Sequence, residues 1–563
     1  MEYAELVAVY REIEATASTD GKTALVASLL EAAPTGDLPM LLPLLQGRVA
    51  PAHERAELGI SSSLTVEAIA KATGVDEAAI EEAWRESGDL GAAAAKAVES
   101  RTQRTLFGTD LTVEFVFETL RGLSAYEGEG SQRRRIDAVA KLLSGADPEE
   151  ARYIIRTVLG HLRIGIGEGT IRDAIARAYL DGSQDAIEAV EYAYQITNDY
   201  PLVARTARED GESGLRELAV EPFRPLQVML ADSADSIEAG IDAVGTGGSP
   251  LLAEYKYDGV RIQLHKDGET VRAYTRRLEE ITEQFPDVVE SVRTHVRADA
   301  CILEGEIVGY DPETGDLTPF QELSTRIKRE HDIEEAAERA PVIVYLFDLL
   351  YLDGRSLLDE SLVERLGELE QLLDPEPWAI EPAQHVRFDP ADPEPARELY
   401  EDALAAGHEG LMLKNLDVSY QPGRRVGYML KVKPTMEPLD VVVTRATYSE
   451  GRRKNRLGRL YLACRDPETD ELREVGRLAT GYTDEELAEL TEELESLVTD
   501  TDGRSVRVRP ELVLEVEYEE IQSSPTYDSG YALRFPRFLR RREDLAVSDV
   551  DTLDRVEALY ESQ

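Results

Sequence analysis

The chain has 563 residues, 42% of them hydrophobic, and a formal net charge of −49 at pH 7. That length predicts about three or four domains with packed cores, while the charge is opposite to that of a typical nucleic-acid-binding protein. No run of roughly 18 apolar residues predicts a membrane span, and no basic-then-apolar start indicates a signal peptide, so we expect a cytoplasmic protein without membrane association. The two cysteines, Cys301 and Cys464, form no Cys-x-x-Cys pair, which excludes a disulfide framework and a structural zinc site.

Residues 1–218 are predicted to be all-helical, with alanine- and leucine-rich segments such as 66–71, 149–159 and 171–179. The glycine-rich stretch 160–169 ends in Gly-x-Gly-x-Gly, at 165–169, and has no preceding strand, which argues against a dinucleotide-binding loop. The backbone amides of this stretch and Arg163 are better suited to contacts with phosphate groups. Two prolines three residues apart, in 222–227, then predict a linker.

After the linker the pattern changes to that of an α/β (α+β) domain, residues 219–434. Short apolar segments predict strands, and longer segments between them predict helices. The expected strands are 252–264, 301–309, 342–351 and 411–414, and the expected helices include 357–373 and 396–406.

Residues 435–563 are predicted to form mainly strands with a single helix, which fits a five-stranded β-barrel of the oligonucleotide-binding (OB-fold) type. The expected strands are 439–444, 460–465, 511–519 and 531–539, and the helix is 484–497.

Lys256 has the setting of a lysine nucleophile. It lies in Glu254-Tyr255-Lys256-Tyr257-Asp258-Gly259-Val260-Arg261, between carboxylates and before a turn glycine and Arg261. A protonated amine cannot attack phosphorus, so an enzyme using a lysine must lower its pKa with cationic groups, a metal or burial. Taken alone, Lys-x-Asp-Gly is also compatible with an ordinary charged hairpin turn.

Further motifs accompany this one in a fixed order. They are Thr-Arg-Arg-Leu-Glu at 275–279, Leu-Glu-Gly-Glu-Ile-Val at 303–308, Tyr-Leu-Phe-Asp-Leu-Leu-Tyr at 345–351, Glu-Gly-Leu-Met-Leu-Lys at 409–414, Lys-Val-Lys at 431–433 and Leu-Arg-Phe-Pro-Arg-Phe at 533–538. Together with 253–265, the set resembles the motifs of ATP-dependent DNA ligases of the archaeal and eukaryotic replicative type, over nearly the whole chain.

The resemblance implies an all-α DNA-binding domain (1–218), an adenylylation or nucleotidyltransferase domain (219–434) and a C-terminal OB-fold domain (435–563). It implies nick sealing in duplex DNA, in replication, repair and recombination, through a lysyl-AMP intermediate. ATP and Mg²⁺ would be the cofactors, nicked double-stranded DNA the substrate, and the enzyme a monomer. Each step would be an in-line displacement at phosphorus.

The same resemblance assigns roles within the site. Lys256 would be the nucleophile, and Glu306 and Glu409 would hold Mg²⁺, which prefers oxygen ligands. The residues implied to bind the nucleotide are Glu254 at the adenine edge, Arg261, Arg276 and Glu306 at ribose and phosphate, Phe347 on the base, and Arg425, Lys431 and Lys433 at the α-phosphate and pyrophosphate. Without the resemblance, Phe347 reads as a buried strand aromatic and Gly423-Arg424-Arg425 as a solvated basic turn.

The chain departs from the family pattern in two places. Met429 stands where the family usually has tryptophan, and Leu545 stands where the last motif usually has lysine. The leucine weakens the assignment of a triphosphate contact at that position, and the arginines of 540–542 would compensate for the missing lysine. Gln103 to Phe107 resembles the short peptides that dock on the sliding clamp, although the same segment also reads as an ordinary loop.

The composition itself indicates adaptation to molar salt. The chain has 111 acidic residues and 51 arginines but only 11 lysines, a surface suited to conditions in which the Debye length is about 3 Å. We therefore expect a halophilic archaeal source. Lysines that persist in such a chain should be enriched where arginine cannot serve, and Lys256, Lys414, Lys431 and Lys433 all fall within the motifs.

Two other functional interpretations stay open. An RNA ligase or a capping-type nucleotidyltransferase would share the lysine core, but it has no reason to carry the helical first domain or segment 521–527, which resembles the barrel of DNA ligases. A catalytically inactive DNA-binding scaffold would not need intact Lys256, Glu306 and Glu409.

Overall fold

The computed structural model describes residues 1–50, 58–101, 111–128, 130–245, 249–318, 320–327, 329, 331–434, 436–449, 455–502 and 504–561. The chain divides into two compact units, Met1–Lys433 and Pro434–Gln563, and each is described by itself. Within the described ranges no single helix is long and apolar enough to cross a membrane, although Thr19–Ala32 and Thr35–Leu45 pass together, as a bent pair, by length and composition alone. The predicted clamp peptide, Gln103 to Phe107, lies outside the described residues.

The first unit begins with helices, as predicted for residues 1–218. They are α1 Tyr3–Ala15, α2 Thr19–Ala32, α3 Leu38–Leu45, α4 Ser62–Thr73, α5 Glu77–Ser87, α6 Leu90–Ser100, α7 Val113–Arg121, α8 Ser131–Gly145, α9 Pro148–Val158, α10 Glu168–Tyr179, α11 Gln184–Thr197 and α12 Tyr200–Glu217. The segments predicted as helical fall within or within one residue of α4, α9 and α10. The glycine-rich stretch joins α9 to α10 with no strand before it, so the argument against a dinucleotide-binding loop is confirmed.

Local capping explains where several of these helices begin and end. Asp147 accepts a hydrogen bond from the Glu150 amide at the start of α9, and the Glu150 side chain accepts one from the Asp147 amide in return. Gly74 and Gly88 end α4 and α5 in the left-handed conformation, which favours glycine. The apolar faces of the helices pack into one core that runs from Tyr3 to Leu215.

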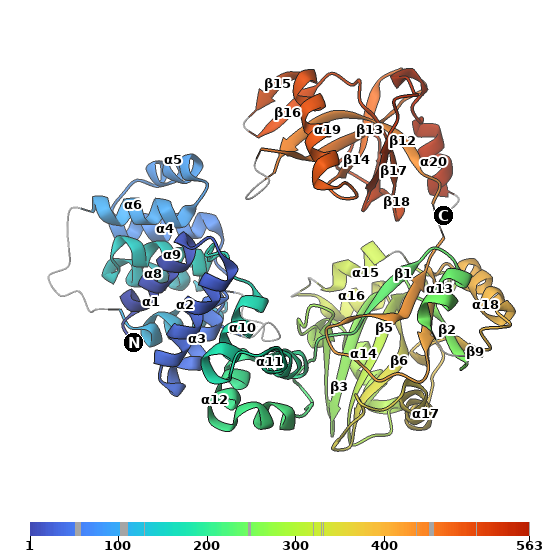
Figure 1. The fold of residues 1–563 in the computed structure, drawn as a ribbon, viewed down its shortest axis with the longest axis horizontal. Helices are drawn as coiled ribbons and strands as arrows, with labels where there is room; N and C mark the ends of the chain where they lie inside the picture. Colours follow the sequence, from blue (N-terminus) through green and yellow to red (C-terminus); the bar gives the residue numbers. More distant parts are fainter. Residues whose placement is uncertain are drawn as a thin grey trace. The chain divides into compact units, whose positions relative to one another are not determined.

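Two β-sheets follow in the same unit (Figure 1). The five-stranded sheet has the order β1-β11-β10-β2-β9, and the six-stranded sheet has the order β4-β3-β5-β6-β7 with β8 beside β6. The strands are β1 Leu230–Ala234, β2 Leu251–Lys256, β3 Val260–Asp267, β4 Thr270–Thr275, β5 Ala300–Gly309, β6 Val342–Leu352, β7 Arg355–Ser356, β8 Ile380–Pro382, β9 His385–Phe388, β10 Gly410–Asn415 and β11 Arg425–Val432. Most ladders are antiparallel, and β1 with β11 and β6 with β8 are the parallel pairs.

Helices cover each sheet separately. Figure 1 shows α13 and α18 beside the five-stranded sheet, where they pack on β2, β10 and β11, and α14 and α17 pack on β6 of the other sheet. The helices of this part are α13 Ile237–Val244, α14 Pro286–His295, α15 Phe320–Ile327, α16 Ile333–Arg339, α17 Leu362–Leu372 and α18 Glu394–Ala405. The α/β class is therefore confirmed. The predicted helix 357–373 is shorter than expected, because residues 357–360 form a turn and Ser361 caps α17, which begins at Leu362.

The prediction of one strand over 252–264 is wrong. The chain leaves the five-stranded sheet at Lys256, turns through Tyr257 to Gly259, and enters the six-stranded sheet at Val260. A Cβ at Gly259 would lie 2.2 Å from the carbonyl oxygen of Ile307, so a residue without a side chain is needed where β5 passes this turn. The turn places Lys256 at the junction of the two sheets.

The second unit is strand-rich, as predicted. Its elements are β12 Leu439–Tyr448, β13 Leu457–Arg465, β14 Leu472–Leu478, α19 Asp484–Leu497, β15 Val498–Asp502, β16 Ser505–Val508, β17 Val513–Glu517, β18 Glu520–Ser523, β19 Tyr531–Arg534, β20 Arg537–Arg541 and α20 Leu553–Glu561. Within the part of the unit that the structure describes, one sheet has seven strands rather than the expected five, because the β15–β16 hairpin extends it. The predicted strand 531–539 is broken at Phe535, whose φ is 49°, and at Pro536.

Both cysteines are fully buried, Cys301 in β5 and Cys464 in β13. Burial raises the pKa of Cys301 to about 12 and raises the pKa of Cys464 as well, because a thiolate is poorly stabilised away from water. Both thiols are free in the structure.

Candidate active site

Three neighbouring strands bring Lys256, Glu409 and Lys433 together. Lys256 ends β2, Glu409 comes directly before β10, and Lys433 directly follows β11. These strands are adjacent in the order β11-β10-β2, with Gly410 opposite Lys256 and Leu411 opposite Val432. The Glu409 Oε2 atom forms ion pairs with the ammonium groups of both lysines, at 2.6 Å from Lys433 Nζ. Two lysines therefore share one carboxylate.

The charge of Glu409 is strongly stabilised by this arrangement. Burial alone would raise its pKa, but Lys256 and Lys433 outweigh burial and lower the pKa to about 2. Glu409 is therefore a carboxylate at any pH at which the enzyme would work. Before Lys256 could attack phosphorus, its amine would have to leave this ion pair and lose a proton.

Glu306 presents the opposite electrostatic situation. It lies on β5, opposite Arg261 of β3, and burial raises its pKa to about 8, with Lys256 and Arg261 opposing the rise and Glu409 adding to it. The carboxyl group therefore lacks enough positive charge nearby to balance its ionised form. Within the described ranges no cluster of three or more His, Cys, Asp or Glu side chains forms a ready metal site.

Arg261 is tied to a residue that sequence reasoning missed. Its Nη2 donates to Glu304 Oε2 at 2.8 Å, and its Nη1 donates to the Met229 carbonyl oxygen at 2.8 Å. Glu304 is completely buried, and in the sequence it reads as one residue of an apolar strand. The Arg261 guanidinium also lies 5.5 Å from the centre of the Phe347 ring, so this predicted pair is brought together.

Glu254 of β2 pairs with Lys414 of β10 in the five-stranded sheet, on the face that also carries Lys256. The Lys414 Nζ lies 2.5 Å from Glu254 Oε1 and 4.9 Å from the centre of the Phe347 ring. Both charged side chains are buried. The Lys414 position was not assigned a role from the motifs, and the scarcity of lysine in the chain was the signal that pointed to it.

Three of the implied nucleotide-binding residues lie outside these contacts. Arg276 is exposed in the turn after β4, and Arg425 donates to the Ala231 carbonyl oxygen at 2.7 Å across the β1–β11 ladder. Lys431 lies on β11, with Met412 as its cross-strand neighbour.

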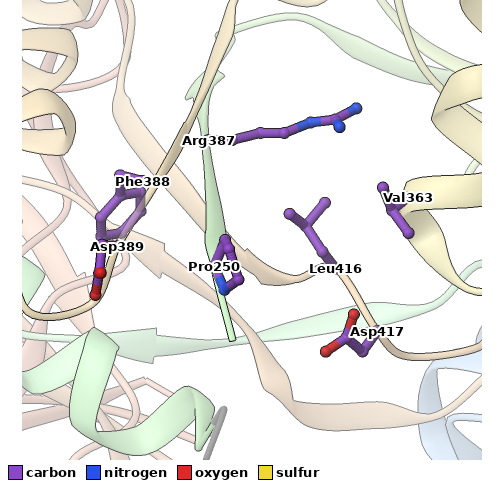
Figure 2. Close-up of a pocket in the computed structure, with 7 residues that line it drawn as sticks. All are labelled: Pro250, Val363, Arg387, Phe388, Asp389, Leu416 and Asp417. Carbon is purple, nitrogen blue, oxygen red and sulfur yellow. The ribbon is translucent and has the colours of Figure 1, made fainter. Parts of the chain in front are cut away.

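Two cavities lie among the described residues of this unit. A narrow cavity lies among Arg261, Phe347, Lys414, Glu304 and Arg365. Figure 2 shows a wider pocket of about 370 Å³, in which Val363 of α17 faces Leu416. Its lining, as far as the structure describes it, contains none of the implied site residues. The lining residues are Pro250, Val363, Arg387, Phe388, Asp389, Leu416 and Asp417.

Family models match three successive parts of the chain. Residues 2–176 match "DNA ligase N terminus", residues 228–433 match "ATP dependent DNA ligase domain", and residues 453–545 match "ATP dependent DNA ligase C terminal region". A DNA ligase of Nanoarchaeum equitans is 43% identical over 100% of this chain and 99% of its own length. One of Thermococcus fumicolans is 42% identical over 100% of this chain and 98% of its own length.

The chain belongs to the ATP-dependent DNA ligases. The enzyme uses ATP and seals nicks in DNA, so the predicted family and activity are confirmed, and likeness over the full length disfavours the RNA ligase, capping and scaffold interpretations. A solved structure named "Pmar-Lig_Pre." covers 95% of this ligase and 99% of itself, at a TM-score of 0.54 and 16% identity, and supports the fold alone.

The two departures from the family pattern have structural explanations in this ligase. Met429 is buried in a cluster with Leu226 and Tyr420, and its flexible thioether can adapt to the shape of that core. Leu545 packs against a small core that includes Val442 and Val513. A lysine at 545 would place a charge beside that apolar cluster.

The arginines of 540–542, expected to compensate for the missing lysine, are neutralised within their own unit. Arg540 pairs with Glu515 at 2.7 Å, Arg541 with Glu493 at 2.7 Å and Arg542 with Asp440 at 2.7 Å. Their charges are therefore available to a nucleotide only when it competes with these carboxylates.

Proposed function

We propose that Lys256 is the nucleophile of this ligase. Its Nζ would form an N–P bond to the α-phosphorus of ATP while the bond from that phosphorus to pyrophosphate breaks, leaving AMP on the lysine. A 5′-phosphate oxygen at the nick would then displace the lysine, and the 3′-hydroxyl would displace AMP. The junction of two sheets, where Lys256 and Lys433 share Glu409, carries this proposal.

The other implied residues take roles around this junction. Glu254 would meet the adenine edge, Phe347 would stack on the base, and Arg261 would act at the ribose and phosphate from its position beside Phe347. Lys433 would approach the α-phosphate and pyrophosphate because it already shares the carboxylate of Lys256. Arg276, Arg425 and Lys431 are proposed for the same phosphates after nucleotide binding.

Glu306 and Glu409 are proposed as the protein ligands of Mg²⁺. The pKa of Glu306, raised to about 8, indicates a carboxyl group that lacks compensating positive charge, and carboxylate oxygens suit a hard cation. Two carboxylates are fewer than a closed site needs, which fits an ion that completes its shell with phosphate oxygens and water. Bound there, Mg²⁺ would neutralise charge on the phosphates.

Mass spectrometry of the labelled enzyme tests the nucleophile. After reaction with ATP, proteolysis and tandem mass spectrometry are expected to locate AMP on the peptide containing Lys256, and added pyrophosphate should remove it by re-forming ATP. AMP on Lys414, Lys431 or Lys433 would reject the assignment.

The second unit should be needed for full activity even though the first unit is compact by itself. We expect residues 1–433 alone to fold, yet to form the AMP adduct and seal nicks roughly 100-fold more slowly, because the groups of 434–563 would help to orient the reactants. Thermal unfolding checks the fold, and gel assays of AMP labelling and sealing measure the loss. Undiminished rates in the truncated protein would show that the second unit is dispensable.

Finer features are proposals that rest on sequence alone. The acidic, lysine-poor composition supports a salt-adapted enzyme of archaeal type. A cytoplasmic location is proposed from the sequence pattern, which predicts neither a membrane span nor a signal peptide. The resemblance to replicative ligases supports roles in replication, repair and recombination by a monomer. A clamp contact through Gln103 to Phe107 rests on the short peptide pattern.

A further inference from the structure

Glu254 is held at one oxygen and free at the other. Its side chain lies on β2, where only 2% of the residue surface is exposed. Oε1 accepts from Lys414 Nζ at 2.5 Å, whereas Oε2 is buried and has no hydrogen-bond partner among the described residues. A buried acceptor without a donor is costly, so the arrangement points to a ligand that supplies the donor.

The charge on Glu254 depends on its neighbours. Burial raises the pKa of Glu254, and Asp348 adds to the rise, while Lys414 and His385 oppose it without cancelling it. The charge of Glu254 also contributes to the raised pKa of the Tyr257 phenol, after burial, which is the largest cause. Lys414 is the cation in direct contact, so the ionised state of Glu254 depends mainly on that lysine.

Lys414 is also held in place from its other side. Its ammonium lies 4.9 Å from the centre of the Phe347 ring, a distance at which the ring face attracts a cation. Lys414 and Glu254 occupy the adjacent strands β10 and β2, with Lys414 opposite Leu252 in the ladder. The lysine therefore has a defined position between the carboxylate and the aromatic ring that the proposed function assigns to the base.

We propose that Lys414 is a specificity-determining residue, which selects a 6-amino purine over a 6-oxo purine by keeping Glu254 an ionised, acceptor-only group. This inference rests on the proposed function, which places the adenine edge at Glu254. A carboxylate can accept a hydrogen bond from an exocyclic amine but repels a carbonyl oxygen. A protonated carboxyl group can donate to that carbonyl oxygen, so the selection weakens once the charge is lost.

The test compares ATP with inosine triphosphate, whose base carries a 6-oxo group. Single-turnover formation of the enzyme-nucleotide adduct is measured with both for the full chain and for Lys414→Met, which removes the charge and keeps an apolar contact with Phe347. The preference for ATP over inosine triphosphate is expected to fall by roughly 10-fold or more, because the mismatch at the buried oxygen is relieved. Lys414→Arg, which keeps the charge, should retain most of the preference.

The pH profile separates this role from a merely structural one. In Lys414→Met, Glu254 loses its direct cation and stays protonated to higher pH, so the preference for ATP should recover as pH rises between about 6 and 9. In the unaltered enzyme, where Lys414 opposes the protonation of Glu254, the preference should change less over that range. Should Lys414→Met not fold, Lys414→Gln serves the same comparison, since its amide is neutral.

Glu254→Gln distinguishes failure of this inference from failure of the proposed function. The amide can donate to a 6-oxo group, so its preference for ATP should collapse if Glu254 reads the purine edge. An unchanged preference in Glu254→Gln would reject the placement of adenine itself. The other outcome is that Glu254→Gln changes the preference, while Lys414→Met slows adduct formation equally with ATP and inosine triphosphate and shows no pH dependence. That result would overturn only the role of Lys414.

Discussion

Ligase carrying Lys256→Arg is expected to form no AMP adduct and to seal nicks at a rate lower by about four orders of magnitude or more. Arginine keeps the positive charge that pairs with Glu409, so the fold should survive. A guanidinium does not deprotonate in proteins and cannot attack phosphorus. Lys256→Ala should be equally inactive, although it leaves Glu409 with Lys433 alone. Gel analysis with α-labelled ATP measures the adduct.

Two comparisons sharpen this result. Lys96→Arg alters an exposed lysine that pairs with Glu86 at 3.7 Å, and it should behave as the unaltered enzyme. A nicked duplex that already carries AMP on its 5′-phosphate bypasses the lysine, so Lys256→Arg should still seal it. Labelling that persists in Lys256→Arg would refute the assignment of the nucleophile.

Nick sealing should be fastest near or above molar KCl and at least roughly 10-fold slower at about 0.1 M, because unscreened acidic surfaces repel DNA and one another. With a net charge of −49, the chain repels DNA and other copies of itself in dilute buffer. At 1 M salt the Debye length is about 3 Å, so this repulsion is screened. Contacts fixed by shape and close hydrogen bonds to the phosphates should persist there.

Sealing rates across about 0.1 to 3 M KCl, at fixed enzyme and nicked duplex, measure this effect. Counterion release alone would produce the opposite trend, a steady loss of affinity as salt rises. Thermal unfolding at the same salt concentrations separates destabilised protein from weakened DNA binding. An optimum at the dilute end would contradict salt adaptation and leave the family assignment untouched.

Short sequence patterns predicted the helices and strands whose ends are determined by neighbouring residues in the chain. The helix α19 has the predicted bounds Asp484–Leu497, because Thr483 and Glu486 form a capping box at its start. The strand over 252–264 was predicted as continuous because apolar residues recur on both sides of Gly259. The turn there is imposed by β5, whose Ile307 carbonyl oxygen lies against Gly259, and sequence separation hides that contact.

The sequence predicts which residues form the site better than it predicts how they are arranged in space. Lys256, Glu409 and Lys433 were each visible in a motif, yet their meeting depends on the strand order β11-β10-β2. The partner of Arg261 was not visible, because Glu304 reads as one polar residue in an apolar strand. Ion pairs between residues far apart in the chain follow from ladder register, which a single sequence does not specify.

Thiol reagents should not modify Cys301 and Cys464 in the folded ligase, because neither sulfur is exposed and burial raises the pKa of both thiols. A cysteine introduced on the surface of each unit would therefore be the reactive one, without prior removal of the native pair. Donor and acceptor dyes attached there would report how far apart Met1–Lys433 and Pro434–Gln563 lie as the enzyme takes up ATP, meets a nick and releases sealed DNA.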